Sequence, residues 1–170
     1  MALLKIVKYG NEILEKPTKK VEVIDDAIRK IVLDMLETMY AAPGIGLAAN
    51  QVGIPLSIAV IDINGLQDNH EALILINPEI INQEGSAKDE EGCLSFPEIF
   101  APVDRPERIT VKAYNLNHEL YEITGEGLLA RAMAHEIDHL VGRLFIERMS
   151  TITRELIKKQ ISKKMKQGEW

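Results

Sequence analysis

The chain has 170 residues, of which 46% are hydrophobic and 27% are charged, a balance typical of a protein with one folded core. Its formal net charge of −6 argues against a nucleic-acid-binding protein, since such proteins usually carry a basic surface, so we expect no specific DNA partner. No apolar run approaches the roughly 20 residues that span a bilayer, and the N-terminus lacks the apolar core of a secretory signal. We therefore expect a cytoplasmic protein with no membrane partner.

The first half of the chain predicts one helix followed by strands. Apolar residues recur at helical spacing over residues 23–40, with Asp25 as a candidate N-cap, and Pro43 and Gly44 end the pattern. A loop is expected from there through Pro55. Runs of β-branched residues predict strands over 56–62, 72–77 and 80–84, with a polar connection over 65–71.

The second half predicts a hairpin and two helices. Residues 109–114 and 120–125 flank a turn-rich segment, which indicates a β-hairpin. A helix opens at Glu126 or Gly127 and runs to about residue 141, where Gly142 closes it. Another helix begins at residue 150 or 151 and runs to about residue 166. Strands that mostly precede the last two helices, with short links, indicate an α+β fold with largely antiparallel strands. No repeat, low-complexity tract or linker divides the chain, so we expect one domain over residues 1–170.

The strongest chemical signal is the segment His135-Glu136-Ile137-Asp138-His139. Positions i and i+4 of a helix lie on one face about one turn apart, so both imidazoles can point at one metal ion. Glu136 stands beside the first ligand, where its carboxylate can reach a water on that ion, as in the H-E-x-x-H pattern. The plainer interpretation is a pair of surface histidines on a charged helix.

A catalytic site of this kind needs a further ligand, because such sites use about three protein ligands and leave one position for water. The candidates are Cys93, His70, His118 and several carboxylates, and both of these histidines are expected to be exposed in polar turns. A thiolate is a strong ligand for such metals, and the Leu94 N–H that follows Cys93 could point at a developing oxyanion. A buried structural cysteine would explain this segment equally well.

The loop from Gly44 to Gln51, with the sequence GIGLAANQ, is the third unusual segment. Its two glycines resemble a phosphate-binding turn, but the rest of that fingerprint is missing. The Gln51 amide could donate to a carbonyl oxygen. A structural loop with a surface glutamine is the equal alternative.

Together the three segments resemble the peptide deformylase family, which removes the formyl group from the N-terminal methionine of new bacterial chains. The family carries the motifs G-x-G-x-A-A-x-Q, E-G-C-L-S and H-E-x-D-H in this order, and all three stand here at residues 44–51, 91–95 and 135–139. Their order and spacing and the length of the chain also agree, so the resemblance covers nearly the whole chain.

The resemblance implies a role for each motif residue. It implies that Cys93, His135 and His139 bind one divalent metal, which would be Fe²⁺ in the cell, with Zn²⁺, Ni²⁺ or Co²⁺ as substitutes. It implies that Glu136 is the general acid and base, and that Gln51 and the Leu94 N–H stabilise the oxyanion. It also implies an α+β fold in which mostly antiparallel sheets surround a central metal-binding helix, with further helices near the two termini.

The implied substrates are N-formyl-methionyl nascent peptides, bound extended along a strand edge. Contacts with the substrate are expected from residues of the glycine loop, the cysteine segment and the metal helix, namely Gly46, Ile45, Gly92, Leu128 and Arg131. Ile45, Leu128 and Arg131 would form the wall of the pocket for the first side chain. Phe100 stands where some relatives carry an arginine, which leaves the finer substrate preference open.

Two other functions compete with this one. A zinc peptidase of the H-E-x-x-H type would take its third ligand downstream of the helix, where only Glu147 or Glu155 could serve. A peptide- or metal-binding module without catalysis is the other rival, but intact Gln51, Cys93 and Glu136 argue against it. The C-terminal helix carries a lysine cluster, which is either a solvated face or a surface for transient contact with the ribosome: Lys158, Lys159, Lys163, Lys164 and Lys166.

Overall fold

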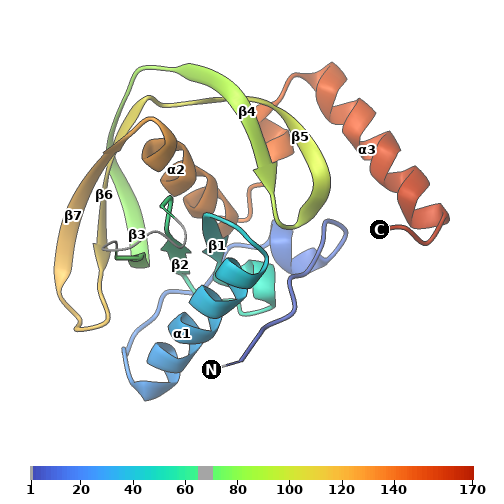
Figure 1. The fold of residues 1–170 in the computed structure, drawn as a ribbon. Helices are drawn as coiled ribbons and strands as arrows, with labels where there is room; N and C mark the ends of the chain where they lie inside the picture. Colours follow the sequence, from blue (N-terminus) through green and yellow to red (C-terminus); the bar gives the residue numbers. More distant parts are fainter. Residues whose placement is uncertain (1, 65–70) are drawn as a thin grey trace.

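The computed structural model describes residues 2–64 and 71–170 and contains three α-helices and seven strands within them (Figure 1). The helices are α1 (Asp26–Ala41), α2 (Leu128–Leu140) and α3 (Thr151–Lys166). The strands are β1 (Gly46–Ala48), β2 (Ile58–Ile61), β3 (Leu73–Glu84), β4 (Ala87–Cys93), β5 (Phe96–Arg105), β6 (Arg108–Tyr114) and β7 (Leu120–Glu126). Three one-turn 3-10 helices complete the order: η1 (Glu12–Glu15), η2 (Ala49–Val52) and η3 (Phe145–Arg148).

The strands form two antiparallel sheets around α2, which confirms the expected α+β class. One sheet has five strands in the order β1-β2-β3-β6-β7, and the other is the β4-β5 hairpin. Helix α2 lies between them, in contact with strands of both sheets (Figure 1). Its apolar side chains, Met133 among them, join Leu75, Ile109 and Val111 of the large sheet in one buried cluster. Burial on all sides explains why α2 carries small and apolar residues around most of its circumference.

The helix ends agree with the caps that the sequence predicts. The Asp25 side chain accepts the Ile28 N–H at 3.1 Å at the start of α1, and Ser150 accepts the Thr153 N–H at 3.2 Å at the start of α3. Gly142 closes α2 with a φ of +80°, and a Cβ there would lie 2.9 Å from the Glu15 carbonyl oxygen. The position therefore needs glycine both for its conformation and for its space.

The strand predictions were partly wrong. The two strands expected over 72–77 and 80–84 are one long strand, β3, whose register shifts beside Pro78 because proline cannot donate to the ladder. Residues expected to be loop include β1, which pairs with β2. The β6-β7 hairpin is confirmed, with Tyr114 opposite Leu120. The polar connection predicted over 65–71 lies almost entirely outside the described residues.

The β4-β5 hairpin was not predicted at all. Strand β4 is rich in charged residues and only one of its seven residues is buried, so it lacks the apolar alternation that marks a half-buried strand. It is held by its pairing with β5, from Ala87 opposite Arg105 to Cys93 opposite Phe96. This hairpin brings Cys93 to α2.

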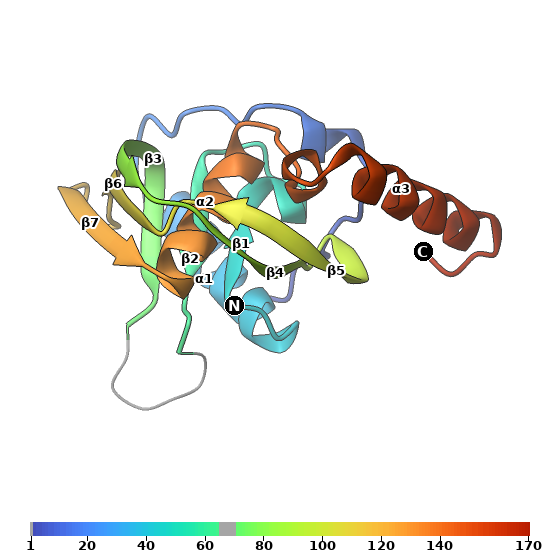
Figure 2. The same cartoon turned by 90° about the horizontal axis from the view of Figure 1, so that it is seen from above.

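Helix α3 lies at one edge of the molecule (Figures 1 and 2). It packs through Ile157 and Ile161 into a cluster that also contains Phe96 and Phe145. After the helix ends, the Trp170 indole donates to the Tyr9 carbonyl at 2.8 Å. Among the described residues, no helix has both the length and the apolar character required to cross a bilayer.

Candidate active site

Helix α2 presents His135 and His139 on one buried face, one turn apart. Their side chains are almost inaccessible to solvent, and their Nε2 atoms lie 3.2 Å from each other. The alanines of this helix leave room for the strands on either side to approach closely. The alternative of two surface histidines is therefore wrong.

Cys93 is the third member of this cluster. It ends β4, directly before the tight Leu94-Ser95 turn that leads into β5, and its Sγ lies 3.3 Å from the Nε2 of His139. The Cys93 sulfur and one nitrogen from each of the two imidazoles lie within 4.8 Å of one another. Of the other histidines considered, His118 is exposed in the β6-β7 turn, and His70 lies outside the described residues.

The chemistry of these donors fits a divalent transition metal. One thiolate and two imidazoles are the ligand types that such ions prefer, and three protein ligands leave a position for water. Burial lowers the pKa of His139 well below its ordinary value, which keeps that imidazole in the neutral form that binds metal. Burial also acts to lower the pKa of His135, but the Glu136 carboxylate and Cys93 raise it well above the ordinary value. Without a metal ion His135 therefore holds a proton, which a bound cation would displace.

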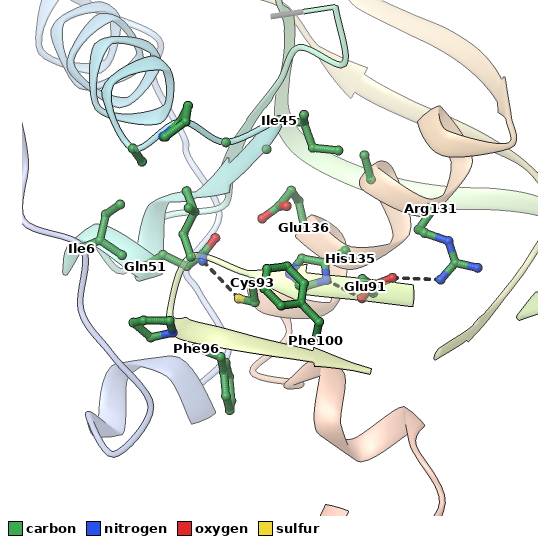
Figure 3. A pocket seen from close by; sticks show the side chains of 18 of the residues that line it. Ile6, Ile45, Gln51, Glu91, Cys93, Phe96, Phe100, Arg131, His135 and Glu136 are labelled. Atoms are coloured by element: carbon green, nitrogen blue, oxygen red, sulfur yellow. Dashed lines mark hydrogen bonds and ion pairs between the residues drawn. The ribbon is translucent and has the colours of Figure 1, made fainter. Parts of the chain in front are cut away.

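Glu136 lies on the same helix and faces the cleft (Figure 3). Burial raises the pKa of its carboxyl group to about 7. Its Oε1 atom is buried and has no hydrogen-bond partner among the described residues. A Cβ atom on Gly46 of β1 would lie 2.6 Å from the Glu136 Oε2, so the glycine makes room for this carboxylate. A partly protonated, unpartnered carboxyl group suits proton transfer near neutral pH.

Gln51 and Leu94 stand on the side of the cleft next to Cys93. The Oε1 of Gln51 accepts the Ala48 N–H at 2.9 Å, and its Nε2 lies 3.1 Å from the Ser95 hydroxyl and 3.6 Å from the Cys93 Sγ. These contacts orient the amide with its NH₂ group toward the cysteine (Figure 3). Leu94 lines the same cleft. The structure thus places the Gln51 amide beside Cys93 and Leu94 in the lining of the same cleft.

The cleft has a volume of about 720 Å³ and is lined by all five residues that the sequence predicts for substrate contact. Ile45 and Leu128 expose their apolar side chains there, at 40% and 51% of their surface. Phe100 is 64% exposed, and its ring lies so close to Gly92 that a Cβ there would be 2.5 Å from it.

Arg131 also borders the cleft, but its guanidinium group is held in place behind it. The group donates to the Glu91 carboxylate at 3.1 Å and to the carbonyls of Val103 and Ala87 at 2.9 Å each. These bonds tie α2 to the β4-β5 hairpin. The stem of Arg131 is the part that remains to border the cleft.

A set of buried charged side chains supports His135 from behind, and sequence reasoning did not single them out. Glu91 lies 2.6 Å from the Nδ1 of His135 and pairs with Arg105, which in turn pairs with Asp138. Burial would raise the pKa of Glu91, but hydrogen bonds with His135 and Arg105 hold it well below its ordinary value. Glu91 and Asp138 lie inside two of the three motifs, and this position could have marked them as functional from the sequence. Arg105 lies in none of the motifs, so the sequence offered no comparable signal for it.

Asn50 is another residue that sequence reasoning missed. It is fully buried in η2, and its Nδ2 donates to the His139 carbonyl at 2.5 Å. The bond joins the glycine loop to the end of the metal helix. Only its place beside Gln51 in the loop motif hinted at such a role.

Comparison with known proteins identifies the same family along the whole chain. The model of the polypeptide deformylase family matches residues 3–155. A peptide deformylase of Acidobacterium capsulatum is 48% identical over 170 residues, covering 100% of both chains. A crystal structure of a peptide deformylase from Legionella pneumophila superposes with a TM-score of 0.90 at 42% identity, over 98% of this chain and 97% of that one. A peptide deformylase from Synechococcus elongatus in complex with actinonin gives a TM-score of 0.89 at 40% identity, over 95% and 87% of the two chains.

Proposed function

Because this chain belongs to the peptide deformylase family, we propose that Glu136, Gln51 and the Leu94 N–H carry out the family's reaction in the cleft. The chain is a metal-dependent hydrolase that removes the formyl group from formylated nascent peptides. One observation supports the assignment of roles above all others: Cys93, His135 and His139 converge beside the buried Glu136 carboxylate, whose Oε1 atom has no hydrogen-bond partner among the described residues.

The cluster of one thiolate and two imidazoles holds one divalent metal ion, and we propose Fe²⁺ in the cell. Ligand affinity alone would favour zinc, but the family that the chain resembles uses iron, with Zn²⁺, Ni²⁺ or Co²⁺ as substitutes. When bound, the ion supplies Lewis acidity, which activates water for attack and polarises an amide carbonyl.

Glu136 moves the proton in the proposed reaction. Its carboxylate accepts a proton from the attacking water as a C–O bond forms at the formyl carbon. The same group then delivers the proton to the methionine nitrogen as the C–N bond breaks, which releases formate and a free amine. A pKa of about 7 lets Glu136 both accept and donate near neutral pH.

Gln51 and Leu94 stabilise the charge that develops on the formyl oxygen. The Gln51 amide is already oriented by Ala48 and Ser95, so it donates without reorganisation during the reaction. The backbone of the tight turn that contains Leu94 is anchored by the Tyr9 N–H, which donates to the Ser95 carbonyl at 2.9 Å.

The proposed peptide site lies between β1 and β4. Gly46 and Gly92 both line the cleft, and we expect an extended peptide to pair with the backbone there. Ile45, Leu128 and the stem of Arg131 form the wall for the methionine side chain. Backbone pairing of this kind serves many sequences, so we expect a broad range of substrates.

Formate release from a formyl-Met-Ala peptide tests this function. The enzyme is assayed as isolated, after treatment with a chelator, and after addition of Fe²⁺ without oxygen. We expect activity to be lost on chelation and restored by the metal, whereas the unformylated peptide should remain intact. Cleavage of an internal peptide bond instead would favour the zinc peptidase. Nothing in the described structure supports that rival's third ligand, because Glu147 is exposed and accepts the Leu144 N–H at 2.6 Å, and Glu155 is exposed on α3, where it pairs with Lys158.

We further propose a single catalytic domain over residues 1–170, a cytoplasmic location and transient ribosome contact through α3. The lysines that support this contact are exposed apart from Lys164, which pairs with Glu98 at 3.2 Å. A contact through lysines should weaken as salt rises. Co-sedimentation with bacterial ribosomes at low and high salt tests it, and the absence of binding at low salt would refute it.

A further inference from the structure

A continuous line of charged side chains runs from His135 to Arg148, away from the cleft. The Nε and Nη2 of Arg105 donate to the two oxygens of Glu91, the acceptor on His135, at 3.0 and 2.7 Å, while its Nη1 donates to Asp138 at 2.5 Å. Arg148 completes the line, with its Nε 2.6 Å from one Asp138 oxygen and its Nη2 2.9 Å from the other.

Each member of this line constrains the next one toward the metal cluster. The Nε2 of His135 faces His139, so the orientation of the ring depends on what its Nδ1 contacts, which is Glu91 at 2.6 Å and, more distantly, the Nη2 of Arg105 at 3.4 Å. Glu91 in turn is held by two bonds from Arg105, a side chain that is 1% exposed, and by one bond from Arg131. Arg105 therefore has little room to move unless one of its carboxylate partners moves.

The position of Arg105 depends on how Asp138 is paired. Asp138 competes with Glu91 for the single guanidinium group of Arg105. Arg148 satisfies both oxygens of Asp138, which leaves Arg105 free to keep its two-point contact with Glu91. Without Arg148, the Oδ1 of this nearly buried Asp138 carboxylate would lose its hydrogen-bond partner among the described residues and draw Arg105 toward itself.

We propose that Arg148 is a positioning residue for the metal centre, acting on His135 through Asp138, Arg105 and Glu91. The inference rests on the proposed function, because it needs His135 to be a metal ligand. Arg148 ends η3, outside all three sequence motifs, and touches none of the cleft residues named above. Its effect should appear in metal retention before it appears in the proton chemistry of Glu136.

The test compares Arg148→Met, Arg148→Lys and a matched control, Arg143→Met. Arg143 is an exposed arginine in the same segment and is not part of the line. Loss of Zn²⁺ to an excess of a coloured chelator is followed for each protein. The visible absorption of the Co²⁺-substituted proteins reports the geometry of the ligands, and thermal unfolding of the metal-free proteins reports the fold.

Removing a direct partner of a metal-bound histidine typically costs 10–100-fold in affinity, and Arg148 acts through three intermediates. We therefore expect Arg148→Met to lose Zn²⁺ about 3- to 10-fold faster and to shift the Co²⁺ bands. Lysine keeps the positive charge but lacks the planar fork that contacts both Asp138 oxygens, so Arg148→Lys should fall between this variant and the wild type. Arg143→Met should match the wild type.

An Arg148→Met protein with a lower melting temperature but unchanged metal loss and Co²⁺ bands would overturn the proposal, since Arg148 would then only stabilise the fold. If that variant does not fold, Arg148→Lys decides in the same way, with unchanged metal loss and bands as the refuting result. Failure of the proposed function gives a different result. Either the wild type itself binds no metal, or the Cys93→Ser variant keeps its metal.

Discussion

Replacing Gly46 by alanine tests the packing of the proposed catalytic carboxylate. The added Cβ would lie 2.6 Å from the Oε2 of Glu136, 3.0 Å from its Cδ and 3.1 Å from its Cγ. Favourable carbon contacts begin at about 3.5 Å, so the carboxylate must move by roughly 1 Å. Glu136 is only 5% exposed, so it has little free space to move into, and the shift changes its position relative to the cleft.

The expected loss follows from that displacement. A misplacement of about 1 Å can cost on the order of 10²-fold in rate, and a positioned acid or base contributes roughly 10²–10⁴ in total. We therefore expect kcat to fall about 10²-fold, which corresponds to about 2.7 kcal/mol of activation free energy. Gly46 has no positive φ, so alanine should fit its backbone in β1 and preserve the fold.

Formate release gives kcat and KM for the variant, and elemental analysis gives its metal content. Gly44→Ala is the matched control from the same loop, because its Cβ would meet the Cδ1 of Leu94 at 2.7 Å, the end of a flexible side chain. We expect the control to lose less than about tenfold, since the leucine can turn away. A Gly46→Ala enzyme that carries metal and works within about threefold of the wild type would show that the position of Glu136 does not limit the reaction.

Three further substitutions separate the proposed roles. Glu136→Gln should keep the metal but lose roughly 10²–10⁴ in kcat, and full activity would remove Glu136 from the mechanism. Gln51→Met should lower kcat on the order of 10²–10³ with metal content unchanged, and an effect on KM alone would argue against an oxyanion donor. Cys93→Ser should lose its metal on dialysis, because a hydroxyl is a far weaker ligand than a thiolate; metal retained in that variant would point to another third ligand.

The helices were predictable because their signals are local. Asp25 and Ser150 cap the helices that follow them, and Gly142 terminates α2, so each boundary depends on residues within one or two turns. The pairing of His135 with His139 follows from helical geometry in the same way. The three motifs together then predicted the family from the sequence alone.

The strands of the site were harder to predict. Strand β1 has three fully buried residues, and β4 is mostly charged, so neither shows the alternation of a half-buried strand. The β4 residues are extended because they pair with β5 and the β1 residues because they pair with β2. The partner of β4 follows after a two-residue turn and the partner of β1 follows after a loop, but neither pairing leaves an apolar alternation in the strand itself.

By itself the sequence determined the class of fold, the metal helix and the types of ligand that were available, since these depend on spacing along the chain. Through the family resemblance the sequence also predicted Cys93 as the third ligand. The tertiary structure alone decided how Cys93 reaches the two histidines and which residues support them. Cys93 reaches α2 on a hairpin, and Arg105 and Arg148 meet Asp138 from opposite sides in sequence. A buried charged group needs a partner of opposite charge, and the fold decides which residue can supply it. The spacing of residues along the sequence does not show which residue that will be.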